Sequence, residues 1–139
     1  MEKILAVDVG DKRTGLAVSD ILGMTANGIG TVVEPNKEKL IMIIWEYAKT
    51  HGVKTVVMGY PVNMNGSIGE RAEKMKWFAE RFTEVTGLKV ELVDERCTTM
   101  IAHGILNTTN TRGQKRKNVV DTLSAEIILQ NYLDSKKRF

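Results

Sequence analysis

Residues 4–20 read ILAVDVGDKRTGLAVSD and place one acid inside a run that is otherwise typical of a buried strand. Two segments rich in Val, Leu and Ala flank a polar turn with a glycine at each end, so we expect a β-hairpin with strands at 3–9 and 14–19. Asp8 lies near the end of the first strand, between two valines. Burying a carboxylate is costly unless something compensates its charge. Asp8 is therefore a candidate functional residue.

The rest of the chain alternates helices and strands. A further apolar run at 28–33 extends the hairpin into a three-stranded antiparallel meander. Apolar spacing and turn residues then predict a helix at 37–49, a strand at 54–60, a helix ending at Gly87, a strand at 88–95, a short helix at 98–107, an exposed loop at 107–118 and a closing helix at 118–134. This order predicts an α/β fold in which helices flank a mixed five-stranded sheet. A length of 139 residues fits a single domain, 1–139.

Composition bounds the class of protein. The hydrophobic fraction is 42%, which favours a folded globular chain, and the single cysteine, Cys97, suits a reducing cytosol, so we expect a cytoplasmic protein. No apolar run reaches the length needed to cross a bilayer, and the chain starts with a strand-like segment instead of a signal peptide. The net charge of +3 is modest, but cations crowd residues 112–117 and 136–138. Such clusters indicate either a solvated surface or a polyanionic partner.

Three acids fall where a cleft is expected. Asp8 ends the first strand, Glu95 ends the fifth, and Asp121 lies among apolar residues in the first turn of the last helix. The ends of parallel strands meet at one edge of a sheet, where clefts form. If the first and fifth strands are neighbours, Asp8 and Glu95 converge there, and the helix can add Asp121 from its sheet-facing side.

The residues that share a helix face with Asp121 support this placement. Ser124 and Ala125 follow it at i+3 and i+4 and share its face, and their small size lets the helix approach the sheet closely. Glu126 points well away from that face, so we expect it to be solvated.

Converging carboxylates repel one another, and the usual remedy is a hard divalent cation. An all-oxygen ligand set suits Mg²⁺ or Mn²⁺, and no Cys/His cluster in the sequence suggests zinc. Two such ions about 4 Å apart can promote phosphodiester hydrolysis. Asp8, Glu95 and Asp121 are therefore candidate metal ligands. The alternative is that Asp8 caps a nearby turn or pairs with Arg13.

Four motifs resemble those of the YqgF family, whose members are described as Holliday junction resolvases and as nucleases that mature the precursor of small-subunit ribosomal RNA. They are DVGDKRTGLAVSD (8–20), MGYPVNMNGSIGERA (58–72), VDERCTT (93–99) and KRKNVVDTLSAEIILQNYLD (115–134), in the family's order and at its spacing. The resemblance implies an RNase H-like fold and a metal-dependent nuclease acting on structured RNA or branched DNA. It also assigns the family's acidic triad to Asp8, Glu95 and Asp121.

Basic residues near these acids are candidates for phosphate contacts, with a solvated surface as the alternative. The segment before the last helix carries four of them, which we interpret as a phosphate clamp beside the metal cleft. The candidate nucleic-acid-binding residues are Lys12, Arg13, Arg96, Arg112, Lys115, Arg116 and Lys117.

Two other function classes remain open at this stage. The segment DVGDKRTG (8–15) also resembles the first phosphate-binding turn of the actin, Hsp70 and sugar-kinase ATPases, but those proteins enclose ATP between two domains and this length supplies one. A non-catalytic nucleic-acid-binding module of the same fold is the other. The motifs do not distinguish RNA from DNA, which depends on contacts to the 2′-hydroxyl, and they leave the oligomeric state undetermined.

Overall fold

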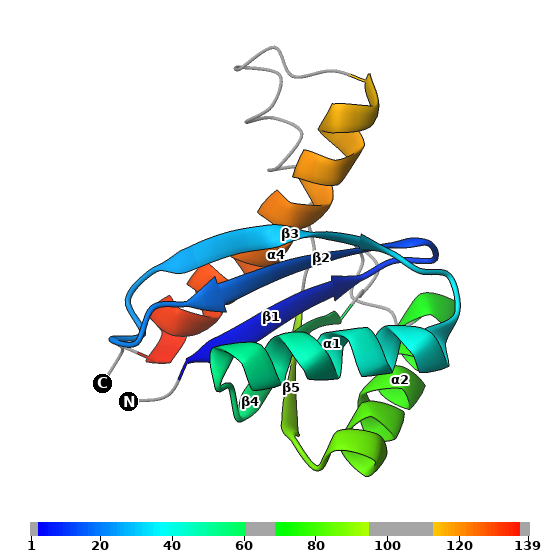
Figure 1. The fold of residues 1–139 in the computed structure, drawn as a ribbon, viewed down its shortest axis with the longest axis horizontal. Helices are drawn as coiled ribbons and strands as arrows, with labels where there is room; N and C mark the ends of the chain where they lie inside the picture. The colour runs from blue at the N-terminus through cyan, green and yellow to red at the C-terminus, as the bar shows by residue number, and fades with distance from the viewer. Residues whose placement is uncertain (1–2, 61–68, 95–112, 137–139) are drawn as a thin grey trace.

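A five-stranded sheet organises the molecule, whose computed structural model describes residues 3–60, 69–94 and 113–136 (Figure 1). The strands are β1 (Ile4–Val9), β2 (Arg13–Ser19), β3 (Ala26–Val33), β4 (Thr55–Tyr60) and β5 (Lys89–Asp94). Their order across the sheet is β3-β2-β1-β4-β5. Pairing is antiparallel among β1, β2 and β3, and parallel from β1 through β4 to β5. The predicted mixed sheet, a meander followed by parallel strands, is confirmed.

Helices cover both faces of this sheet. Helices α1 (Lys37–His51) and α2 (Glu70–Thr86) lie on one face, and α4 (Gly113–Lys136) lies on the other (Figure 1). Alternate residues of β1 serve the two sides: Leu5 and Val7 belong to the core under α1 and α2, whereas Ala6 packs in the core under α4. This two-residue alternation puts Asp8 on the α4 side.

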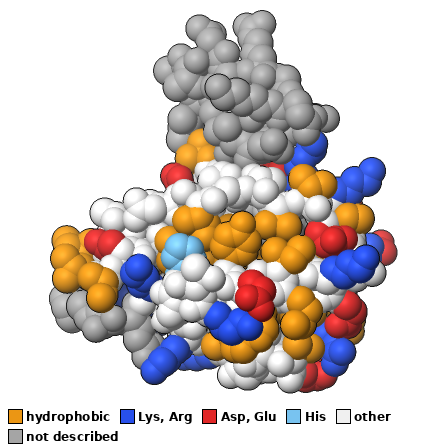
Figure 2. Space-filling view, in the orientation of Figure 1, with side chains coloured by type: hydrophobic (Ala, Val, Ile, Leu, Met, Phe, Trp, Pro, Cys, Tyr) orange, Lys and Arg blue, Asp and Glu red, His pale blue; other side chains and the backbone are white. Residues whose placement is uncertain are grey.

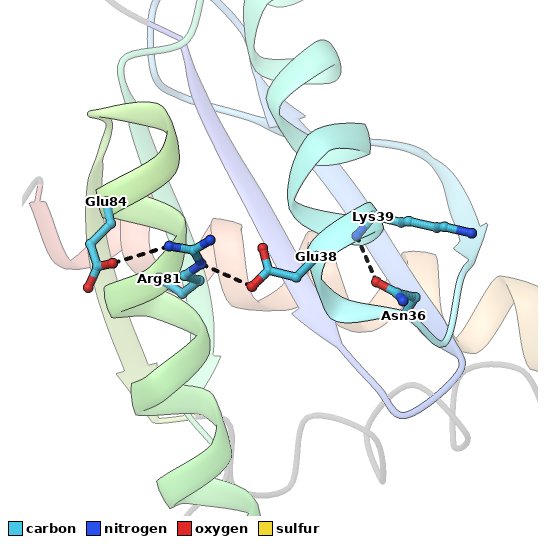
Figure 3. A network of polar contacts seen from close by, with 5 residues as sticks. All are labelled: Asn36, Glu38, Lys39, Arg81 and Glu84. Carbon is cyan, nitrogen blue, oxygen red and sulfur yellow. Dashed lines mark hydrogen bonds and ion pairs between the residues drawn. The ribbon is translucent and has the colours of Figure 1, made fainter.

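A polar network on the surface joins the two helices of the first face (Figure 3). The side chain of Asn36 caps α1 by accepting a hydrogen bond from the backbone N–H of Lys39 at 3.0 Å. Arg81 of α2 contacts Glu38 of α1 at 2.9 Å and Glu84 of its own helix at 3.4 Å. Exposed ion pairs contribute about 1 kcal/mol or less, so the buried core carries most of the stability on this side.

The last helix begins earlier than the sequence predicts. It starts at Gly113, so residues 113–118 of the predicted loop are helical, and Asp121 lies in the third turn instead of the first. Residues 114–117 are Gln, Lys, Arg and Lys, all strong helix formers, and nothing between them and the apolar face breaks a helix. The polar composition that favoured a loop is equally compatible with the exposed start of a long helix.

Two parts of the predicted element order cannot be compared with the described residues. The predicted short helix at 98–107 and residues 107–112 of the predicted loop lie outside the described residues. Among the helices that the structure describes, none combines the length and the apolar character needed to span a membrane.

Candidate active site

The site is built around the end of β1. Asp8 pairs across the antiparallel ladder with Gly15 of β2, and both residues face α4. Asp8 is partly exposed, whereas Val7 and Val9 on either side of it are buried on the opposite face. The strand is thus fixed by its valines, and the carboxylate between them is held toward the last helix.

Gly15 explains how α4 comes so close. A Cβ atom added at Gly15 would lie 1.8 Å from the backbone oxygen of Asp121 and 2.9 Å from the backbone nitrogen of Thr122. Any side chain at this position would therefore collide with the helix backbone. A glycine inside a strand often marks such a close approach, and this one brings Asp121 over the end of β1.

The face of α4 that follows Asp121 is packed as predicted. Ser124 is 1% exposed and Ala125 is 0% exposed, and Ala125 packs against the sheet with Ala6 and Ala17. Small side chains on both surfaces allow the helix to lie almost directly on the strands. The predicted sheet-facing position of Asp121 is confirmed.

The two acids interact electrostatically. Burial and, to a smaller extent, the negative charge of Asp8 together raise the pKa of Asp121 to about 6, against the opposing positive charge of Arg13. One carboxylate oxygen of Asp121, Oδ2, is buried and has no hydrogen-bond partner among the described residues. A half-buried carboxylate beside a second acid, with an unsatisfied oxygen, is a position suited to a cation.

Arg13 belongs to this site. It lies two residues before Gly15 on β2, so strand alternation puts both on the α4 side. Its side chain is half-buried, and its Nε has no hydrogen-bond partner within the described part of the chain. Arg13 is one of the predicted phosphate contacts, and the structure places its guanidinium within electrostatic range of Asp121.

Hydrogen bonds from β3 fix the outer side of α4. The hydroxyl groups of Thr31 and Thr122 are 2.8 Å apart, and the backbone N–H of Gly28 donates to Glu126 Oε1 at 2.8 Å. Glu126 is partly exposed, so its predicted solvation holds in part, but its carboxylate also accepts this hydrogen bond from the edge strand. Because α4 lies over β2 and β3, the outermost strand offers its backbone N–H groups to the flank of the helix, which a helical projection alone does not reveal.

The third predicted acid is one residue beyond the described part of β5. Glu95 follows Asp94, the last residue of that strand, and lies outside the described residues, as do Arg96 and Arg112. The condition that the first and fifth strands are neighbours is wrong, because β4 lies between β1 and β5 and pairs with both. Within the described ranges, no group of three His, Cys, Asp or Glu side chains is placed to hold a metal ion.

The remaining cations differ in how they are held. Lys12 is exposed in the turn between β1 and β2, where its backbone oxygen accepts a hydrogen bond from the N–H of Glu34 at 2.8 Å. Lys115, Arg116 and Lys117 lie in the first turns of α4, not in a loop. In the view of Figure 1 the yellow-orange start of this helix extends past β3.

Comparisons with known proteins agree with this geometry. Residues 2–135 match the RuvX family, described as Holliday junction resolvase. A protein of Clostridioides difficile (strain 630) is 44% identical over 134 residues, covering 96% of this chain and 95% of its own. One of Carboxydothermus hydrogenoformans is 42% identical over 136 residues, covering 98% and 99%. Both carry the name "Putative pre-16S rRNA nuclease".

Solved structures show the same fold at low sequence identity. Thermus thermophilus RuvC in complex with a Holliday junction substrate superposes with a TM-score of 0.59 at 13% identity, over 99% of this chain and 96% of that chain. The Fowlpox virus resolvase bound to Holliday junction DNA gives a TM-score of 0.57 at 13% identity, over 98% and 99%. The fold is therefore that of the RuvC-like resolvases, and the predicted RNase H-like class is confirmed.

Proposed function

Because the chain belongs to the RuvX family, we propose that it is a divalent-metal-dependent nuclease that hydrolyses phosphodiester bonds in structured nucleic acid. The observation that carries the proposal is the pair formed by Asp8 and Asp121. These two acids come from distant parts of the sequence and interact electrostatically at the end of β1, and the pKa of Asp121 stays raised despite the opposing charge of Arg13.

The donor set fits Mg²⁺ or Mn²⁺. Both acids offer hard oxygen ligands, and Asp121 Oδ2 lacks a hydrogen-bond partner among the described residues, so a cation would satisfy it. We assign Asp8, Asp121 and Glu95 as the residues that would hold the metal. When bound there, the ion would supply charge stabilisation to the phosphate and to the leaving oxygen.

The sequence of β5 supports Glu95 as the third ligand. Val93 packs in the core under α4, and the two-residue alternation of the strand predicts the same side for Glu95. Strands separated by one neighbour lie roughly 9–10 Å apart. Two carboxylate side chains reaching toward a pair of ions about 4 Å apart can span that separation.

Cations around the acids would bind and orient the substrate. Arg13 acts electrostatically on Asp121, and its partly buried guanidinium can hold the phosphate that is attacked while it favours the ionised form of Asp121. We assign contacts with other phosphates of the bound nucleic acid to Lys12, Arg96, Arg112, Lys115, Arg116 and Lys117. Three of these, Lys115, Arg116 and Lys117, lie on α4 and not in the loop that the sequence predicts.

The substrate that we favour is the precursor of 16S rRNA, processed at its 5′ end in the cytoplasm during ribosome biogenesis. This follows the names of the relatives at 42–44% identity. Four-way junction DNA is the second candidate, because the fold neighbours include resolvases bound to that substrate.

Cleavage of the two substrates in parallel tests the proposal. With Mg²⁺ or Mn²⁺ the protein should cut an RNA that contains the 16S 5′ leader, or a four-way DNA junction, and excess EDTA should abolish the reaction. Asp8→Asn should lower the rate on the order of 10²–10³-fold or more, because charge stabilisation is usually the largest catalytic contribution.

Glu80→Gln is the matched control, since Glu80 is an exposed acid on α2, on the other face of the sheet. It should cleave at the rate of the unmodified protein. Cleavage at full rate by a folded Asp8→Asn variant, or in excess EDTA, would refute the proposal. Unfolding of Asp8→Asn would instead support a structural role for that acid.

A further inference from the structure

The end of β1 has a second side, away from the acids. Asp8 faces α4, but the next residue, Val9, faces α1 and α2, where it lines a small pocket together with Met75. The pocket has a volume of about 40 Å³, and both of these apolar side chains are buried. A cavity needs only about 10–15 Å³ to hold one water molecule, so this one has room for a small polar group.

Three cations surround this pocket. Lys37 comes from the first turn of α1, and Arg71 and Lys74 come from the first turns of α2. Two acids are close by: Asp11 also lines the pocket, and Glu70 forms an exposed ion pair with Lys74 at 3.6 Å. The formal charge of the five groups is +1, and Arg71 has no ion pair within the described ranges.

Two backbone hydrogen bonds hold the ammonium of Lys37 against the turn between β1 and β2. The ammonium donates hydrogen bonds to the backbone oxygens of Gly10 at 2.8 Å and Asp11 at 3.0 Å. A lysine ammonium has three donors, so one remains. Burial lowers the pKa of Lys37, the nearby charge of Lys74 lowers it further, and Asp11 opposes the shift. An anion between the two lysines would relieve their repulsion.

The backbone adds to the positive potential. Both α1 and α2 begin at this end of the sheet, beside the turn that joins β1 to β2 (Figure 1). The N-terminus of a helix carries partial positive charge and attracts phosphate. The N-cap of α2 is Gly69, which offers no side-chain hydrogen bond to the first turn.

The positive charge around this pocket is confined to a small area of the surface. Over α1 and α2, the face shown in Figure 2 has acidic and basic side chains interspersed with apolar ones, and no broad basic area covers it. A bound polyanion would therefore meet this side of the molecule at a particular point and not through a general field.

We propose that the pocket of Lys37, Arg71 and Lys74 binds a backbone phosphate of the nucleic-acid substrate, on the opposite side of the β1 end from Asp8 and Asp121. The inference rests on the proposed nuclease function. A substrate strand would then cross the turn between β1 and β2, with one phosphate at the carboxylates and another in the pocket. Lys37 connects that turn to α1 through its hydrogen bonds to Gly10 and Asp11. Phosphate binding in the pocket is therefore coupled to the position of Asp8 through residues 9–11, which follow Asp8 directly and line the pocket.

The test measures binding without cleavage. A fluorescent RNA stem-loop is titrated with the full-length protein in EDTA at several KCl concentrations, and the slope of log K against log[KCl] is recorded. Arg71→Gln combined with Lys74→Gln should weaken binding and reduce the slope by about 0.7–0.9, the value for one lost phosphate contact. Lys39→Gln combined with Lys76→Gln removes the same amount of charge from exposed positions on α1 and α2 outside the pocket, and should leave the slope unchanged.

Two results would overturn the assignment of the pocket as a phosphate-binding site. One is a wild-type slope for the Arg71/Lys74 variant, and the other is an equal loss in the Lys39/Lys76 control, which would indicate a general charge effect. A third arm titrates inorganic phosphate and follows the amide resonances of Val9, Gly10 and Asp11. Perturbation there with an unchanged RNA slope would mean that the pocket takes free phosphate, and the nucleic-acid assignment would fail.

The result of this binding experiment can be distinguished from the result of the nuclease test. If the slope falls as expected but no substrate is cleaved with Mg²⁺ or Mn²⁺, the pocket stands as a nucleic-acid contact and the catalytic assignment fails. If cleavage occurs and the slope is unchanged, the reverse holds.

Discussion

The two faces of the sheet are built differently. The side covered by α1 and α2 is filled by large apolar residues, among them Leu40, Phe78 and Phe82, each no more than 2% exposed. The side covered by α4 is lined near β1 by small residues, including Ala6 and Ala17, and is joined by polar contacts from β3. Under α1 and α2, large side chains exclude water from the sheet. Under α4, small side chains allow the helix backbone to approach the backbone of β2.

This difference separates stability from chemistry. Large side chains bury the most apolar area and contribute most to folding. Small side chains contribute less, but they allow α4 to lie against β2 so that Asp121 reaches the end of β1. The two acids thus lie on the side where α4 approaches the strands most closely.

The largest expected effect contrasts the two cores directly. Phe82→Ala should lower the free energy of unfolding by about 3–5 kcal/mol, because Phe82 is fully buried. Ser124→Ala, on the α4 side, should be neutral or slightly stabilising, since its buried hydroxyl has no hydrogen-bond partner among the described residues. Urea unfolding of both variants measures this, and equal losses would break the contrast between the faces.

The next effect tests the close approach of α4. Gly15→Ala should destabilise the protein by about 1–3 kcal/mol, because a new Cβ would meet the backbone of Asp121 at 1.8 Å and force the helix outward. It should also abolish the coupling between the two acids. The matched control is Gly52→Ala, at a left-handed helix end with open space around it, where the cost is conformational and the acids are unaffected. An unchanged stability and pKa of Asp121 in Gly15→Ala would contradict the account.

Much of this architecture follows from local patterns in the sequence. Alternating apolar residues predict the strands, and the i+3 and i+4 spacing of Ser124 and Ala125 predicts which side of α4 faces the sheet. What local patterns miss is set by tertiary partners. The contact of Glu126 with Gly28 requires knowing that α4 lies over β3, and the insertion of β4 between β1 and β5 is a property of strand order. Gly15 is the residue whose position within a strand best signals the approach of α4.

The smallest effect concerns Asp121 itself. Its pKa is raised from 3.8 to about 6 in the folded protein, so folding is favoured by protonation and stability falls as the pH rises from about 4 to about 6. Asp121→Asn removes this penalty. Allowing for solvent screening of a half-buried group, the gain should be about 1–2 kcal/mol above pH 6, and it should vanish near pH 4. Thermal unfolding in EDTA across this pH range measures it.

The most direct test of the central claim, that Asp8 and Asp121 form a cation-binding pair, adds Mn²⁺ to the same unfolding experiment at pH 7. The unmodified protein should be stabilised by Mn²⁺, by about 2.7 kcal/mol at a hundred times the dissociation constant. Asp121→Asn should melt higher than the unmodified protein in EDTA and gain much less from Mn²⁺, and Glu80→Gln should show neither change. A lower melting temperature of Asp121→Asn in EDTA together with a full Mn²⁺ response would contradict the account and make Asp121 a structural residue.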